Sequence, residues 1–222
     1  KNKFQNQEVF LNFASVCQNM NKQNDAILLL KEAIKINPTN SAPFFKMGFI
    51  LNNNGRFYEA LPFAKKAIDL DPNLWQGYHN LIKILINLNR PKEAKLEALK
   101  AKRLFSNNHL FDSLLGDINS YTGDFNEAKK FYKRAISLSP DDEVTIYTYA
   151  NFSIGIGNKK ESIKFFNKVL EINPLHSLSF YSLSTIIEIE KDEVIKDKIK
   201  KLNLLDFKSN YDRYTILFSK SH

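Results

Sequence analysis

Apolar residues recur along this chain at the spacing of amphipathic helices, and polar turns separate the runs at regular intervals. One face of a first predicted helix carries apolar residues at i, i+3, i+4 and i+7, namely Phe10, Phe13, Ala14 and Cys17. A second run has the spacing i, i+4 and i+7 at Ala26, Leu30 and Ala33. The pattern therefore predicts two antiparallel helices of about three to four turns each, joined by a short turn.

Prolines mark where this arrangement repeats. Four of the seven prolines recur with a period of 34 residues, at Pro38, Pro72, Pro140 and Pro174. The one position of this series without a proline is Ser106. Because proline cannot continue a helix behind it, each mark predicts the end of a repeat. A fixed period of this length is typical of stacked helical units. Pro62 is an exception, because it falls inside a predicted helix and should bend that helix or confine it to its early turns.

Four further positions recur with the same 34-residue period when residue 7 is counted as position 1. We call the set of residues at one such position a column. Position 15 reads Asn21, Gly55, Asn89, Gly123 and Gly157. Position 19 is always acidic, with Asp25, Glu59, Glu93, Glu127 and Glu161. Position 20 reads Ala26, Ala60, Ala94, Ala128 and Ser162, and position 27 reads Ala33, Ala67, Ala101, Ala135 and Val169.

Each column has a physical reason. Glycine or asparagine at position 15 lets the chain leave a helix through a left-handed residue. The acid at position 19 then lies in the first turn of the next helix, where the helix dipole favours negative charge. Small residues at positions 8 and 20 allow the two helices of a pair to approach closely. No single pair can cover its own apolar faces, so the pairs must stack.

The columns together resemble the tetratricopeptide repeat, which we abbreviate TPR. The second repeat carries its signature at Phe44, Met47, Gly48, Leu51, Ala60, Ala64, Ala67 and Pro72. The fourth repeat departs from it, because Asp112 stands where the family has an aromatic residue. The resemblance implies an all-α fold, a right-handed α-solenoid of about six 34-residue helix–turn–helix repeats.

The resemblance also implies an organisation for the chain. Repeats begin near residues 7, 41, 75, 109, 143 and 177, so that 1–190 holds repeats 1 to 5 and the first helix of repeat 6. In 191–222 the pattern degrades into a second helix rich in lysine and a truncated first helix of a further repeat. The tail from Tyr214 to His222 resembles the last repeats that precede the catalytic domain in bacterial TPR-containing sulfotransferases.

In the family, positions 2, 5, 6, 9, 12 and 13 of the first helices face a concave groove. The resemblance therefore implies a partner-binding set that interleaves aromatic rings with amides and few charges: Asn12, Phe45, Phe49, His79, Asn80, Lys83, Asn87, Asp117, Tyr121, Tyr147, Asn151 and Tyr181. Aromatic rings give contact area at low entropic cost, and amides pair with an extended backbone. The columns lack the lysine, asparagine and arginine set that clamps a chaperone's C-terminal carboxylate, so we predict no such clamp.

No motif in the sequence has the spacing that catalysis or metal binding needs. The histidines are scattered without i, i+4 pairs, and the lone Gly155-Ile156-Gly157 fits a repeat turn better than a phosphate loop. We therefore predict no catalytic residue, no metal and no cofactor. The net charge of +8 comes from lysines spread over all repeats. This favours weak, salt-sensitive attraction to polyanions over specific nucleic-acid binding.

These observations leave three functional hypotheses. The first is a noncatalytic scaffold that binds a peptide or helix of a protein partner in its groove. The second is a substrate-recruiting arm of a larger transferase, either a sulfotransferase or a glycosyltransferase. The third is an adaptor that self-associates through open ends of the solenoid. The sequence has no apolar run long enough to span a membrane and no secretory signal, so we expect no membrane association and a cytoplasmic location.

Overall fold

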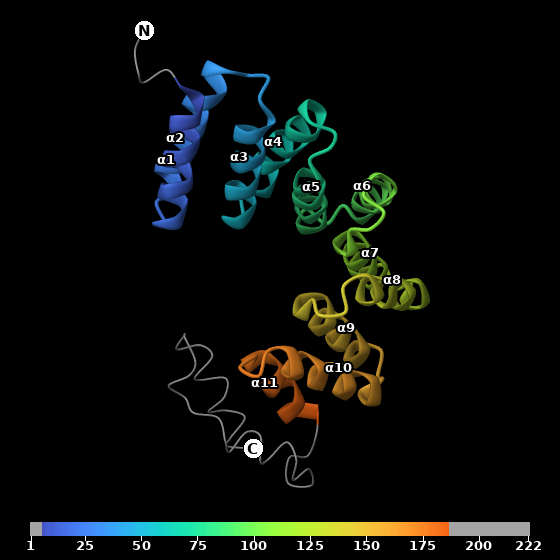
Figure 1. Ribbon diagram of the computed structural model, residues 1–222. Coiled ribbons are helices and arrows are strands. Elements are labelled where there is room, and N and C mark those ends of the chain that lie inside the picture. The colour runs from blue at the N-terminus through green and yellow to red at the C-terminus, as the bar shows by residue number, and fades with distance from the viewer. Residues whose placement is uncertain (1–5, 187–222) are drawn as a thin grey trace. The chain divides into compact units, whose positions relative to one another are not determined.

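The computed structural model of the protein describes residues 6–186, and in this part every regular element is a helix (Figure 1). The elements are α1 (Gln7–Asn19), α2 (Gln23–Ile36), α3 (Ser41–Asn53), α4 (Phe57–Leu70), α5 (Trp75–Asn87), α6 (Pro91–Leu104), α7 (His109–Tyr121), α8 (Phe125–Leu138), α9 (Glu143–Gly155), α10 (Lys159–Ile172) and α11 (Ser177–Ile186). The two helices predicted beyond residue 190 lie outside the described residues.

The helices recur with the predicted period. Each odd-numbered helix begins 34 residues after the last, from Gln7 to Ser177. Helices α1 and α2, α3 and α4, α5 and α6, and α9 and α10 pack together as pairs. The prediction of an all-α fold built from paired helices is therefore confirmed.

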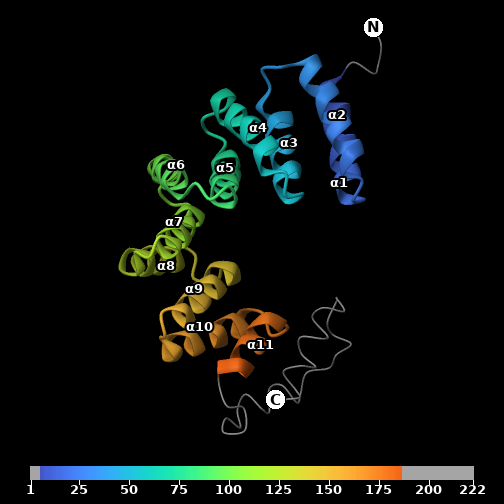
Figure 2. The same ribbon diagram turned by 180° about the vertical axis from the view of Figure 1, so that it is seen from behind.

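The chain divides into two compact units, residues 1–123 and 124–222. In the N-terminal unit, α2 packs on α3, α4 on α5 and α6 on α7, so each second helix contacts the next first helix (Figures 1 and 2). In the C-terminal unit, α8 packs on α9, and α10 packs on both α9 and α11. Within each unit the faces that one pair leaves open are thus covered by the next pair.

The turn inside each pair is left-handed at position 15, as predicted. All five residues of this column have positive φ, from 56° at Asn89 to 84° at Gly123. At the end of α9, Gly157 N–H donates to Ile154 O at 2.8 Å and Asn158 N–H donates to Ser153 O at 2.8 Å. These bonds satisfy carbonyls that the helix end would otherwise leave without donors.

The residues at positions 20 and 27 lie in the core. All ten residues at positions 20 and 27 have no exposed surface. Gly48 shows how close the approach is, because a Cβ there would stand 3.1 Å from Ala64 N on the paired helix α4. The close approach of the helices therefore leaves room only for small side chains at Gly48, as the small-residue columns predict.

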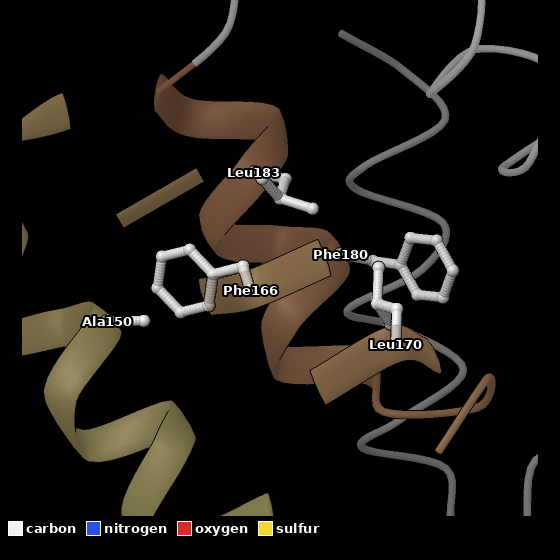
Figure 3. Packing of buried hydrophobic residues seen from close by; sticks show 5 residues of the cluster. All are labelled: Ala150, Phe166, Leu170, Phe180 and Leu183. Carbon is white, nitrogen blue, oxygen red and sulfur yellow. The ribbon is translucent and has the colours of Figure 1, made fainter. Parts of the chain in front are cut away.

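Larger side chains fill the layer between pairs. In the C-terminal unit, Ala150 of α9, Phe166 and Leu170 of α10, and Phe180 and Leu183 of α11 form one buried cluster (Figure 3). In the N-terminal unit, Phe105 follows α6 and packs on Tyr78 and Phe111, with ring centroids 5.8 and 5.7 Å apart.

Helices α6 and α4 differ from what the prolines predict. Helix α6 ends at Leu104, two residues before Ser106, just as the other second helices end two residues before a proline. The ring packing of Phe105 and the Asn108 cap of α7 supply a stop without proline. Pro62 does not confine α4 to its early turns, because α4 runs for 14 residues, as α2 does. Its ring is exposed, which keeps it out of the contacts with neighbouring helices.

Candidate functional site

Side chains of α3 and α5, with one residue of α7, enclose a pocket of about 200 Å³ in the N-terminal unit. Its lining consists of Phe45, Phe49, Asn52, Asn53, Trp75, Gln76, His79, Asn80, Lys83 and Leu110. We call it the groove pocket. Five of the twelve residues expected to bind a partner are in this lining, namely Phe45, Phe49, His79, Asn80 and Lys83.

The walls of the groove pocket are largely apolar. Phe45 and Phe49 lie one turn apart on α3, with ring centroids 6.1 Å apart, and Trp75 begins α5. Phe49 is 37% exposed and Phe45 is half-buried, whereas the other large apolar residues of α3 are buried. A large apolar surface open to solvent in a concavity favours contact with an apolar group of a partner.

A hydrogen-bonded series of amides lies beside these rings. Asn87 Nδ2 donates to Asn52 Oδ1 at 3.1 Å, and Asn52 Nδ2 donates to Asn80 Oδ1 at 3.3 Å. Asn80 is 4% exposed, and its Nδ2 has no acceptor among the described residues. Because Gly48 has no side chain, this amide can lie against α3, where a Cβ would stand 3.3 Å away. The series holds the side chains of Asn52 and Asn80 in the lining, and it joins them to Asn87, which lies outside the lining.

Lys83 is the one charged residue in the pocket lining. Within residues 6–186 it forms no ion pair. Burial, followed by the nearby charge of Lys83, lowers the pKa of His79 to about 4. The imidazole is therefore neutral at pH 7, and the pocket carries a single positive charge at its rim.

The remaining expected residues of the N-terminal unit lie outside the groove pocket. Asn12 is exposed on α1, and Asp117 is half-buried on α7. Tyr121 ends α7, and its hydroxyl donates to Asn89 Oδ1 at 2.8 Å across one repeat. The structure thus gathers five of the expected residues in the pocket, whereas Asn12, Asn87, Asp117 and Tyr121 lie outside its lining on α1, α5 and α7.

The three expected residues of the C-terminal unit lie on α9 and α11. Tyr147 packs its ring against Phe166 and His176, with centroids 5.7 and 4.9 Å away. Asn151 Nδ2 donates to the Tyr147 carbonyl at 3.1 Å, so its donor is engaged within its own helix. Tyr181 is 40% exposed. Tyr147 and Asn151 thus make contacts within the C-terminal unit itself.

Sequence reasoning missed part of the pocket lining. Gln76 and Leu110 occupy position 2 and Asn53 occupies position 13, which are groove columns, so a fuller reading of the columns could have found them. Trp75 occupies position 1, outside those columns. Its one sequence signal is that it is the only tryptophan in the chain.

Within residues 6–186, no three side chains of histidine, cysteine, aspartate or glutamate gather as a metal site would require. In the same part of the chain, no helix combines the length and apolar character needed to cross a membrane.

Three tetratricopeptide repeat models match the chain, over residues 7–40, 29–61 and 122–183. Together with the 34-residue period and the paired helices, these matches show that the chain belongs to the tetratricopeptide repeat family.

Among curated proteins, the chain is 25% identical over 190 residues to human protein O-mannosyl-transferase TMTC3. The match covers 78% of this chain and 21% of that protein, so the chain spans about a fifth of that relative's length.

Solved structures share the fold. TTC0263, a thermophilic TPR protein of Thermus thermophilus, superposes with a TM-score of 0.71 at 17% identity, covering 82% of this chain and 98% of that one. YrrB, described as a TPR protein with an unusual peptide-binding site, has a TM-score of 0.59 at 18% identity, covering 81% and 93%.

Proposed function

We propose that this chain is a protein-binding scaffold that holds an extended segment or helix of a protein partner against its first helices. The observation that supports the proposal most is the groove pocket. It brings together Phe45 and Phe49 of α3 with Asn80 and Lys83 of α5. The family resemblance implied partner binding for all four side chains. Proteins of this family are in general scaffolds for protein partners, and the similar protein YrrB has a peptide-binding site.

The direct test uses peptides selected from a displayed library of random 12-residue segments, with the 222-residue chain as bait. Affinities of the selected peptides are then measured by fluorescence anisotropy for the wild-type chain and two double variants. Phe45→Ala with Phe49→Ala should weaken binding at least tenfold, because it removes the apolar walls. Tyr58→Ala with Leu96→Ala removes similarly large exposed side chains from the second helices α4 and α6 and should change binding less than twofold.

The opposite ranking of the two double variants would contradict the proposal, as would a library that yields no binder. Circular dichroism of each variant checks that a lost affinity does not reflect lost folding.

A second candidate is a repeat arm that recruits substrates to a transferase domain. The similarity to O-mannosyl-transferase TMTC3 favours it, since the matched region is about a fifth of that enzyme. The predicted likeness of residues 214–222 to sulfotransferase arms lies outside the described residues and stays a prediction. Sequencing the complete open reading frame tests this candidate, and a reading frame without any catalytic domain would contradict it.

A third candidate is self-association through α1. Phe13 and Val16 are 59% and 51% exposed, whereas their equivalents in the next repeat, Met47 and Ile50, are 1% and 2% exposed. Among residues 6–186 no helix covers this face of α1, and in this candidate a second copy of the chain covers it. Analytical ultracentrifugation should then show a dimer that Phe13→Ser with Val16→Ser dissociates. A monomer at all concentrations would contradict this candidate.

A further inference from the structure

The proposed function leaves open which partner segments bind, and the groove pocket limits this choice. The size of the pocket is the first limit. Its volume of about 200 Å³ is below the roughly 300–1,000 Å³ of sites that enclose a whole small molecule. A pocket of this size between two helices accommodates one side chain of a longer segment that continues along the helices.

The chemistry of the walls is the second limit. Phe45, Phe49 and Trp75 present aromatic rings, and Leu110 adds an aliphatic group from α7. Burying an apolar side chain against these rings removes apolar surface from water, which favours the complex. A large aliphatic or aromatic side chain gains the most from this contact, whereas a small or charged one gains little.

The charge at the rim is the third limit. Lys83 has no carboxylate partner in residues 6–186, and the lining contains no acidic residue. The neighbouring His79 ring is neutral at pH 7, so it neither adds to nor cancels this charge. Asp117, one repeat further on, lies outside the lining. The local field therefore attracts a carboxylate and repels a lysine or arginine.

We propose, on the basis of the proposed function, that the groove pocket receives one large apolar side chain of the bound segment and that Lys83 pairs with an aspartate or glutamate next to it. The partner class is thus an acidic segment with an aromatic or aliphatic anchor residue. Phe49 and Trp75 contact the anchor, and Lys83 selects the charge of its neighbours.

Host peptides with one variable core test both halves of this assignment. A 12-residue serine- and asparagine-rich host carries a central phenylalanine flanked by two aspartates, two serines or two lysines, and a fourth peptide replaces the phenylalanine with alanine. By fluorescence anisotropy, the wild-type chain should bind the peptide with aspartate flanks most tightly, then the one with serine flanks, and the one with lysine flanks most weakly. The affinities for aspartate and lysine flanks should differ at least tenfold. The alanine peptide should bind at least tenfold more weakly than its phenylalanine parent.

Variants of the chain then assign these preferences to residues. Lys83→Glu should reverse the preference between aspartate and lysine flanks. The control Lys66→Glu changes an exposed lysine on α4 and should leave this preference unchanged. Phe49→Ala should remove most of the difference in affinity between the peptide with a central phenylalanine and the peptide with a central alanine. An unchanged charge preference in Lys83→Glu, or an unchanged anchor preference in Phe49→Ala, would overturn the assignment.

The outcome also separates this inference from the proposed function. If library-selected peptides lose binding in the Phe45 and Phe49 double variant but Lys83→Glu leaves their charge preference intact, the scaffold proposal stands and only the segment class is wrong. If no peptide binds the chain, both fail.

Discussion

Lys102 and Asp112 form an ion pair in which Nζ lies 2.5 Å from Oδ1, and the Asp112 side chain is completely buried. The pair joins position 28 of the third repeat to position 4 of the fourth. At the equivalent junction in the C-terminal unit, Leu170 and Phe180 belong to one apolar cluster. An ion pair has therefore replaced an apolar contact between repeats.

The first prediction concerns this pair. Lys102→Leu leaves the buried Asp112 without its lysine and should lower the free energy of unfolding by about 3–5 kcal/mol. Lys102→Leu combined with Asp112→Phe restores the apolar pairing and should be as stable as the wild type or more stable. Urea denaturation measures both.

The matched control is the exposed pair of Lys35 and Glu32, where Lys35→Leu should cost less than about 1 kcal/mol. A double variant as unstable as Lys102→Leu alone would show that the junction needs the ion pair itself.

The second prediction concerns the left-handed turns. Gly157 has a φ of +76°, and a Cβ there would contact nothing within 4 Å, so Gly157→Ala should cost about 1–2 kcal/mol through the backbone alone. Gly155, two residues earlier, ends α9 without positive φ and has the same open surroundings. Gly155→Ala should therefore be neutral or stabilising by up to about 1 kcal/mol. Thermal denaturation compares the melting temperatures of both variants with that of the wild type. Equal changes in the two variants would contradict a cost that comes from the left-handed backbone at Gly157.

The third prediction concerns Glu161 in the C-terminal unit. Its carboxylate accepts hydrogen bonds from Lys129, Tyr149 and Asn158, and Lys133 lies 3.3 Å away. Burial alone would raise its pKa, but the hydrogen bonds from Lys129, Tyr149 and Lys133 outweigh this and lower the pKa to about 2.

Because the folded pKa lies below the ordinary value of 4.5, the stabilisation is present above pH 4.5 and is lost as the pH falls towards 2. Glu161→Gln should be less stable than the wild type at pH 6, and the difference should shrink at pH 3. Urea midpoints at both pH values measure this. The exposed Glu32→Gln serves as the control, and a difference that does not depend on pH would contradict the prediction.

The fourth prediction concerns His79. Its folded pKa of about 4 lies below the ordinary value of 6.5, so only the unfolded chain takes up this proton between those values. The wild type should therefore lose stability as the pH falls from 6.5 to 4, beyond the loss seen for His79→Gln. Between pH 7 and 8, the urea midpoints of the wild type and of His79→Gln should change with pH in the same way. Parallel curves throughout would contradict the lowered pKa of the half-buried imidazole.

Much of the fold was predictable because it depends on local rules that repeat. Positive φ at position 15 follows from glycine and asparagine, and buried contacts at positions 20 and 27 follow from small residues. The ion pair of Lys102 and Asp112 was not predicted, although both residues depart from apolar columns. Comparing position 28 of each repeat with position 4 of the next could have found it.

The candidate site was predictable only in part. The family resemblance implied that Phe49 and Lys83 face a groove, and helix periodicity gave the positions to which that implication applies. They could not show that Trp75 lines the pocket, because position 1 is not among the family's groove positions. Nor could they show that Asn151 is bonded to its own helix, since that depends on a rotamer.

Photo-crosslinking tests most directly whether partner segments bind at the first helices. The photoreactive residue p-benzoylphenylalanine is placed at position 49 in the groove pocket or at position 58 on α4, where Tyr58 is 83% exposed. Library-selected peptides are irradiated with each protein, and the adducts are identified by mass spectrometry. We predict adducts from position 49 and none above background from position 58. Adducts from position 58 alone would contradict the account.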